Sequence, residues 1–234
     1  MKFNFINKAL TAISFALLIA ILYNVMSYKS WDRYYYFSSV CTPESYPVRL
    51  QDCYFITADK NELGTINKED IFRNNSKWGE EYFFAEVQEP LRLPKQLVLE
   101  YVSYSDKKQY QDTIDLPQEK IKNIFIKADK KNQFEDIHNS SKEVKGLRFL
   151  VGIASNGNVI VWIRGKFLEE VLLKTKLNPK DEISNKENMS IEIEKIFKDL
   201  PNDIKIKVKS GWEKNANYLD STTHYIELNK ERWQ

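Results

Sequence analysis

The chain has 234 residues, of which 42% are hydrophobic, 13% aromatic and 29% charged. This apolar and aromatic content excludes an intrinsically disordered chain, and the length suits one domain behind a short leading segment. Lys and Arg number 35 against 33 acidic residues, so the net charge is only +2. Because the charges are interspersed, they provide no field that would select nucleic acid as a partner.

The amino terminus carries an uncharged apolar segment from Ala9 to Tyr28. About 20 helical residues cross the roughly 30 Å hydrocarbon core of a bilayer. Apolar side chains occupy every face of the helical wheel here, whereas a helix packed on a soluble core is polar on one side. We therefore predict a membrane anchor. Its anchoring residues are Ala9, Leu10, Ile13, Phe15, Leu17, Leu18, Ile19, Ile21 and Leu22.

The charges that flank this segment predict its orientation. Lys2 and Lys8 precede it, and the basic residues that follow are partly offset by Asp32. By the positive-inside rule, the N-terminus stays in the cytoplasm and the rest of the chain is exported. We predict two parts: residues 1–30 as the cytoplasmic tip and anchor, and residues 31–234 as one exported domain.

Two features of this region are open to a second interpretation. Lys2 and Lys8 also form the n-region of a signal peptide, with Val25-Met26-Ser27 as a tolerable cleavage pattern, although the long apolar run favours retention. The aromatic run 31–37 fits either an interfacial belt or the first strand. Both the retained and the cleaved form export the residues after about Ser30.

The chain contains two cysteines, Cys41 and Cys53. In an oxidising compartment such a pair favours a disulfide, which contributes roughly 2–4 kcal/mol to stability, over two buried free thiols. A metal site is disfavoured because neither histidine nor a third cysteine lies nearby to complete a tetrahedral set.

Alternation and turn residues predict the elements that follow. We expect a strand at 48–57, a loop at 59–76 and a hairpin of strands 96–105 and 108–116. Pro117 then opens a helix, whose apolar stripe is Ile121, Ile124, Phe125 and Ala128. Two apolar runs at 147–154 and 159–163 flank Asn156-Gly157, which favours a central hairpin with a type I′ turn.

The carboxyl-terminal part is predicted to add another strand at 167–173 and a second amphipathic helix ending at Pro201. The apolar positions of that helix are Ile193, Ile196, Phe197 and Leu200. Ile204, Ile206 and Val208 alternate as in a strand, and residues 225–228 suit a last strand. The predicted fold class is α+β, with a mainly antiparallel sheet, hairpins and two packed helices, preceded by one N-terminal transmembrane helix.

The sequence contains no G-x-S-x-G elbow, Walker A loop, G-x-G-x-x-G or H-E-x-x-H motif. We therefore predict no catalytic, cofactor-binding or metal-binding residue, and no enzyme. Several residues of types used in catalysis or ligand binding are expected instead at the surface or in packing contacts. These are His138 and His224, the acidic pairs Glu80-Glu81 and Asp112/Asp115, and Trp78 and Trp162.

Several short motifs resemble one bacterial family. They are Leu93-Pro94, Tyr101-Val102-Ser103-Tyr104, Ile114-Asp115-Leu116-Pro117, Val151-Gly152-Ile153, Gly157 and the run 159–165, Val-Ile-Val-Trp-Ile-Arg-Gly. Together they are similar to the family called domain of unknown function 2931, most clearly from Pro47 to Leu173. The resemblance implies a small exported or lipid-anchored protein of a Gram-negative bacterium. This chain lacks the lipobox cysteine, which favours a transmembrane anchor.

The apolar segment and its flanking charges, together with the exported character of the family, give the expected location. It is the inner membrane, single-pass, with the domain in the periplasm, or the periplasm after signal cleavage. The resemblance also implies a class of function. Genes of this family often lie beside phospholipase-type effectors of the type VI secretion system, which implies an immunity protein that binds a secreted lipase. The alternatives are a structural or envelope-maintenance protein and, less favoured, a hydrolase. The expected partners are the membrane and a secreted effector, without nucleic acid or a cofactor.

Overall fold

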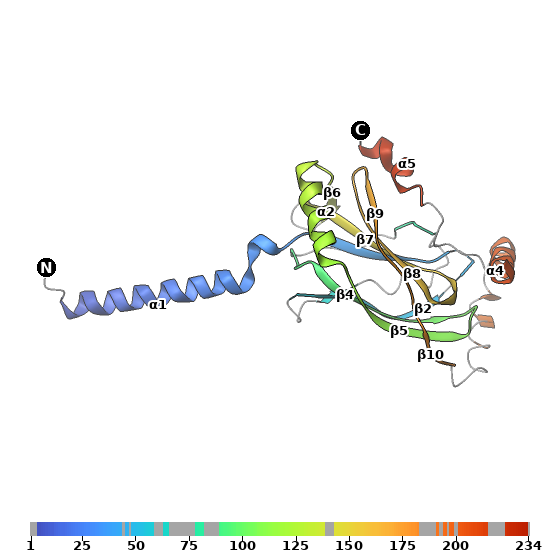
Figure 1. Cartoon of the computed structure of the whole chain (residues 1–234), viewed down its shortest axis with the longest axis horizontal. Helices are drawn as coiled ribbons and strands as arrows, with labels where there is room; N and C mark the ends of the chain where they lie inside the picture. Colours follow the sequence, from blue (N-terminus) through green and yellow to red (C-terminus); the bar gives the residue numbers. More distant parts are fainter. Residues whose placement is uncertain are drawn as a thin grey trace. The chain divides into compact units, whose positions relative to one another are not determined.

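Helix α1 spans Phe5–Tyr28 in the computed structural model of the chain (Figure 1), as the apolar segment predicted. The structure describes residues 4–43, 45–46, 48–58, 63–65, 78–81, 89–138, 143–182, 191, 194–195, 197–198, 201–214 and 223–233. By its contacts the chain divides into two units, Met1–Arg33 and Tyr34–Gln234.

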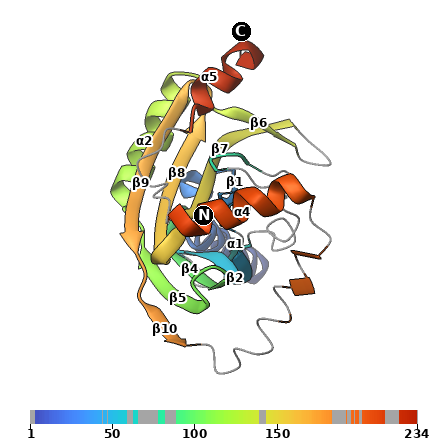
Figure 2. The same cartoon turned by 90° about the vertical axis from the view of Figure 1, so that its right-hand side faces the viewer.

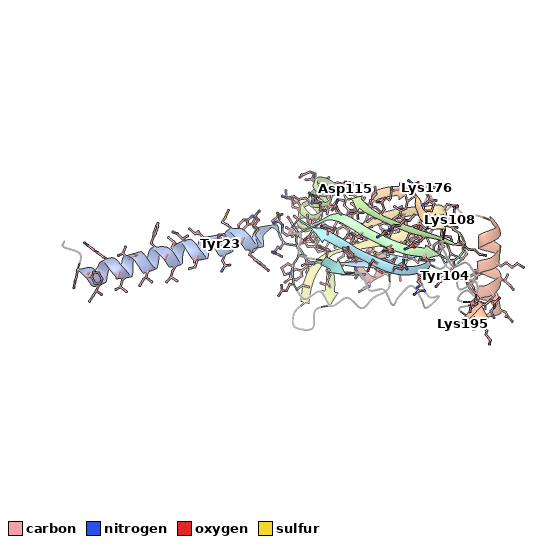
Figure 3. All side chains as sticks on the ribbon, turned by 90° about the horizontal axis from the view of Figure 1, so that it is seen from below. Tyr23, Tyr104, Lys108, Asp115, Lys176 and Lys195 are labelled. Atoms are coloured by element: carbon pink, nitrogen blue, oxygen red, sulfur yellow. The ribbon has the colours of Figure 1, made fainter. Side chains whose placement is uncertain are left out.

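None of the side chains of α1 is buried, and they project from every side of the helix, Tyr23 among them (Figure 3). An 18-residue window within the segment Phe5–Asp32 has a mean hydropathy of 2.1, and the segment is long and apolar enough to cross a membrane. Inside this segment the Thr11 hydroxyl donates to the Asn7 carbonyl at 2.8 Å, which satisfies a polar group without water. The helix ends at Lys29, whose left-handed φ of 48° closes the last turn.

The aromatic run after α1 divides between the two units. Ser30–Asp32 form a short 3-10 turn (η1) in which Trp31 is 59% exposed, whereas strand β1 covers Tyr36–Cys41 and buries Tyr36 and Phe37. Of the aromatic run 31–37, therefore, only Tyr36 and Phe37 belong to the first strand.

Two five-stranded sheets make up the second unit among the described residues. Sheet 1 has the order β1-β7-β8-β9, with β6 also pairing with β7, and sheet 2 has the order β10-β5-β4-β2-β3. The sheet 1 strands after β1 are β6 Glu135–His138, β7 Glu143–Ile153, β8 Asn158–Gly165 and β9 Leu168–Lys176. The sheet 2 strands are β2 Val48–Thr57, β3 Leu63–Thr65, β4 Pro94–Ser103, β5 Lys108–Asp115 and β10 Pro179–Glu182.

Pairing is antiparallel except between β1 and β7, where Tyr36 lies opposite Leu147 in a parallel register. The α+β class with a mainly antiparallel arrangement is confirmed. The strand at 48–57 and the hairpin of β4 and β5 are also confirmed. In the central hairpin, Asn156 and Gly157 have φ values of 60° and 79°, and the Asn158 amide donates to the Ser155 carbonyl, as a type I′ turn requires.

The main core lies between the facing surfaces of the two sheets and beneath helix α2, Gln118–Lys130. This helix buries Ile121, Ile124, Phe125 and Ala128, the four residues of the predicted stripe. Phe125 packs against Phe149 of β7 and Tyr36 of β1, with ring centroids 6.4 and 6.5 Å apart. Figure 2 shows α2 running alongside β9 at the edge of sheet 1.

The predicted Cys41–Cys53 disulfide is not formed: both cysteines are buried free thiols. Cys41 packs with Leu150 and Trp162 on the outer face of sheet 1, whereas Cys53 belongs to the main core between the sheets. A bulge between Leu50 and Asp52 shifts the alternation of β2 and turns Cys53 inward. Because a disulfide needs Cβ atoms about 4 Å apart, cysteines separated by a sheet cannot bond.

Two predicted strands are helices. Residues 202–214 form α4, Asn202–Lys214, in which Val208 is buried while Ile206 is 68% exposed. A strand would place the side chains of Ile206 and Val208 on the same face, whereas a helix places them on different faces. Lysine, which is frequent in this segment, also has a high helix propensity. Residues 225–228 lie in the short helix α5, Tyr225–Asn229, which the 3-10 turn η4, Lys230–Trp233, follows.

Parts of two other predictions lie outside the described residues. Ile193, Ile196 and Leu200 of the second amphipathic helix and most of the loop at 59–76 lie outside the described residues. Within that loop, β3 pairs with β2 through Tyr54 and Thr65, which adds a strand that was not predicted.

Candidate functional site

Two arginines lie directly opposite each other on the outer face of sheet 1. Arg148 of β7 pairs in register with Arg164 of β8, and their neighbours Phe149 and Ile163 point into the core. Strand alternation thus sends both guanidinium groups outward. They are nevertheless only 3% and 0% exposed. Two like charges at this spacing, removed from water, require compensating anions.

Three glutamates from separate parts of the chain supply these anions. Glu135 of β6 lies 2.6 Å from Arg148 Nη2. Glu169, which lies opposite Arg164 in the β8–β9 register, is 2.6 Å from Arg164 Nη2 and also accepts from Arg164 Nε at 2.7 Å. The described segment 78–81 contributes Glu81. The network thus joins four strands, β6, β7, β8 and β9, to the segment 78–81 through charge-assisted pairs, which are stronger than neutral hydrogen bonds.

Glu81 bridges the two arginines with one oxygen on each. Its Oε2 lies 2.8 Å from Arg148 Nη1, and its Oε1 lies 3.4 Å from Arg164 Nη1. The adjacent Gly79 carbonyl accepts from Arg164 Nη1 at 2.7 Å, and the Gly79 amide donates to the Cys41 sulfur at 3.4 Å. Gly79 has a φ of 79°, and a Cβ there would lie 2.8 Å from the Thr223 side chain, so the position favours glycine.

The carboxyl-terminal segment closes the network from the outside. The Tyr225 hydroxyl donates to Glu135, and the Thr223 hydroxyl donates to Glu169 Oε2 at 2.7 Å. The Arg164 guanidinium also lies 4.4 Å from the centre of the Tyr225 ring, a cation–π distance. Burial, followed by the charges of Glu81 and Glu135, raises the pKa of Tyr225, so its phenol stays protonated and acts as a donor.

A pocket of about 290 Å³ opens beside this network. Its walls come from segment 78–81, from β7 and β8, and from the carboxyl-terminal residues of α5 and η4, which lie beside β9 (Figure 2). Arg148, Arg164 and Glu81 contribute to the wall, while Leu228 and Arg232 line the carboxyl-terminal side. The pocket is thus lined by buried charged side chains on the sheet side and by exposed apolar and charged side chains on the carboxyl-terminal side.

An apolar cluster continues from the network along the same face of sheet 1. Trp78 packs edge-on against Trp162 with ring centroids 5.3 Å apart, and both therefore serve in packing, as predicted. Cys41 lies in this cluster, where burial raises the pKa of its thiol to about 12. The Cys41 thiol is therefore protonated at neutral pH and is not a nucleophile.

A second polar cluster joins the turns of the two main hairpins. Asp106, in the β4–β5 turn, accepts hydrogen bonds from the Tyr46 hydroxyl, from the Tyr110 hydroxyl at 3.0 Å and from the Asn156 amide at 3.1 Å. Burial is the main cause that raises the pKa of Tyr46 and of Tyr110, which remain hydroxyl donors. This cluster fixes the hairpin turns of sheet 1 and sheet 2 to each other.

The acidic pairs of the sequence have different environments in the structure. Glu80 is exposed, as are Asp112 and Asp115, in agreement with the predicted solvated charges. The prediction was wrong for Glu81, whose side chain is 4% exposed within the arginine network. Among the described residues, no group of three His, Cys, Asp or Glu side chains has an arrangement that could hold a metal ion.

Each histidine lies at the end of a secondary-structure element. His138 ends β6, and the exposed His224 lies between Thr223 and Tyr225 with a φ of 52°. The residues that sequence reasoning missed are Arg148, Arg164, Glu135, Glu169 and Tyr225. The sequence did contain one signal of the network. An arginine within an apolar central strand, as in Leu-Arg-Phe or Ile-Arg-Gly, is rarely buried unless an acidic side chain pairs with it.

Comparison with known proteins identifies the family of the chain and nothing more specific. No curated protein and no solved structure matches it. The family model described as "Protein of unknown function (DUF2931)" matches residues 25–226, a range that contains the five charged residues of the network and Tyr225. The chain therefore belongs to the DUF2931 family.

Proposed function

We propose that the chain is a binding module of the periplasm, held at the inner membrane by α1, which acts by contact rather than by catalysis. The anchor is supported by a 24-residue helix without a buried side chain. Lys2 and Lys8, which precede the uncharged segment Ala9–Tyr28, support export of residues 31–234 by the positive-inside rule. Retention of α1 would concentrate the module at the membrane surface.

The observation that favours contact over catalysis is that each buried charge is paired with an opposite charge of the network. Arg148 is paired with two glutamates, Arg164 with two glutamates and a carbonyl, and Glu135 and Glu169 also accept from Tyr225 and Thr223. Catalytic acids and bases need a proton that can leave or arrive near neutral pH. Here the tyrosine stays protonated, and the nearby Cys41 thiol is buried and protonated.

Such a network holds a surface in a fixed shape, which favours binding. Its charge pairs connect β6, β7, β8, β9 and segment 78–81, so their relative positions are set before a partner arrives. Preorganisation raises affinity because less conformational freedom is lost on association. For the partner we propose a secreted lipase-type effector, so that the chain serves as its immunity protein. This choice rests on the resemblance of the sequence to genes that accompany such effectors.

Co-expression tests the proposed partner. The full chain would be produced together with the product of an adjacent lipase-type gene, directed to the periplasm. We expect the chain to protect the cells and to co-purify with the lipase from detergent extracts. Growth arrest despite normal levels of the chain, with no complex at micromolar concentrations, would contradict the immunity role. An envelope defect in a deletion strain that has no effector would favour envelope maintenance instead.

Two further measurements test the location. A C-terminal alkaline phosphatase fusion should be active and a cytoplasm-only reporter inactive, whereas the reverse pattern would overturn the topology. Intact mass of the purified chain should include Met1 to Tyr28. A mass that corresponds to cleavage near Ser27 would show that the segment is a signal peptide rather than an anchor.

A further inference from the structure

The three glutamates of the network differ in how firmly they are held and in what they face. Glu135 and Glu169 each make an arginine contact of 2.6 Å and accept a second bond from Tyr225 or Thr223. Glu81 lies 2.8 Å from Arg148 but 3.4 Å from Arg164. Of these three glutamates only Glu81 lines the pocket. The carboxylate of Glu81 is therefore the member of the network that a ligand could replace.

The groups around Glu81 match a carboxylate in shape and charge. Arg148 and Arg164 stand opposite each other, so that one carboxylate can place an oxygen on each guanidinium, as Glu81 itself does. Planar guanidinium groups recognise planar carboxylates in this way. Across the pocket, Arg232 supplies a third cation, and the 71% exposed Leu228 supplies an apolar edge.

The pocket itself favours an anion once Glu81 moves aside. Three arginines and two glutamates line it, and the second glutamate, Glu80, is exposed to solvent, where its charge is screened. Glu135 and Glu169 do not line the pocket and keep their contacts with the arginines. A carboxylate that takes the position of the Glu81 oxygens thus preserves the charge balance of the buried pair.

We propose that this pocket is a carboxylate-binding site whose resting occupant is the side chain of Glu81. The incoming carboxylate bridges Arg148 and Arg164, Arg232 contacts it from the opposite wall, and Glu81 turns outward. The proposal is independent of the immunity role, since it concerns the pocket and holds for a carboxylate of a protein side chain or of a small acid.

The test measures binding of acetate and of inorganic phosphate to the full chain in non-ionic detergent, at constant ionic strength set with sodium chloride. The readout is the NMR signal of ¹⁵N-labelled arginine side chains. We expect saturable, millimolar binding of acetate, tighter than that of phosphate. Glu81→Gln should strengthen acetate binding by about tenfold or more, because it removes a like charge from the site. Arg232→Ala should weaken it, whereas Arg49→Ala on sheet 2 should leave it unchanged.

A second arm identifies the source of the carboxylate with a capped Gly-Gly-Glu-Gly-Gly peptide, whose only acid is a side chain. Peptide binding tighter than acetate binding assigns the site to a protein partner, and equal binding assigns it to a small acid. The proposal is overturned if phosphate binds more tightly than acetate, or if a folded Glu81→Gln chain binds acetate no better than the unmodified chain. If Glu81→Gln does not fold, equal acetate binding by the Arg232→Ala and Arg49→Ala chains overturns it.

Discussion

Arg164→Met would remove the charge that holds two carboxylates inside the second unit. The Arg164 side chain is fully buried, with Nη2 2.6 Å from Glu169 and Nη1 3.4 Å from Glu81. Methionine keeps most of the apolar length of the side chain, so the substitution tests the charge more than the packing. Glu169 loses its cationic partner, and the Gly79 carbonyl loses a donor.

The expected loss of unfolding free energy follows from these contacts. Removal of one partner from a buried ion pair costs about 3–5 kcal/mol, because the other charge is left uncompensated. The Glu169 side chain is 20% exposed and can regain some water, which places the loss near the lower end of that range. Loss of the cation–π contact with Tyr225 adds up to roughly 2 kcal/mol, because both side chains are buried. We therefore expect a total of about 3–5 kcal/mol.

Urea unfolding followed by far-UV circular dichroism measures this loss on the full chain in detergent at neutral pH. Arg49→Met, at an exposed arginine of β2, is the matched control and should cost less than about 1 kcal/mol. Adding Glu169→Gln to Arg164→Met should restore part of the stability, because the stranded charge is removed. Two results would refute the reasoning. One is a loss of unfolding free energy for Arg164→Met equal to that for Arg49→Met. The other is a loss for the double variant that exceeds the sum of the losses of its two single variants.

Three further predictions concern other parts of the second unit. Cys41 and Cys53 should not react with a thiol reagent in the native protein, but both should react in denaturant without added reductant. If neither reacts in denaturant until reductant is added, the two form a disulfide. Gly152→Ala should cost about 1–3 kcal/mol in urea unfolding, because its Cβ would lie 2.5 Å from the Trp162 ring, and an unchanged midpoint would contradict that contact. Alkaline pH should destabilise the fold through four buried tyrosines whose pKa is raised mainly by burial. They are Tyr46, Tyr101, Tyr110 and Tyr225. Because unfolded tyrosine titrates near pH 10, their contribution should be constant below about pH 9 and decline above about pH 10. A urea midpoint unchanged between about pH 9 and pH 11, measured against neutral pH, would contradict this.

The elements that sequence reasoning found correctly depend on interactions between residues close in the chain. The stripe of α2 needs only a spacing of three and four residues, and the Asn156-Gly157 turn needs only two residues that tolerate positive φ. The misassigned segment at 202–214 shows where local pattern is ambiguous. Apolar residues at alternate positions fit a strand, but the burial of Val208 without Ile206 selects the helix.

The free thiols illustrate a different limit. Proximity of Cys41 and Cys53 in the sequence suggested a bond, yet β1, which carries Cys41, and β2, which carries Cys53, belong to different sheets. Cys41 packs on the outer face of sheet 1, whereas Cys53 points into the core between the sheets. Sequence spacing does not say which sheet a strand joins or which face a residue occupies after a bulge, so the separation of the two sulfurs became visible only in the folded sheets.

The sequence by itself determined the apolar helix, the hairpins, the α+β class and the family, because composition, short-range periodicity and turn residues are properties of neighbouring positions. The tertiary structure alone decided the arginine network. Its members meet because β6, β7, β8 and β9 belong to one sheet while the segment 78–81 and the carboxyl-terminal residues cover its outer face. These members are Glu81, Glu135, Arg148, Arg164, Glu169 and Tyr225. Buried charges must find partners wherever the fold brings them, and those partners can lie at any distance along the chain.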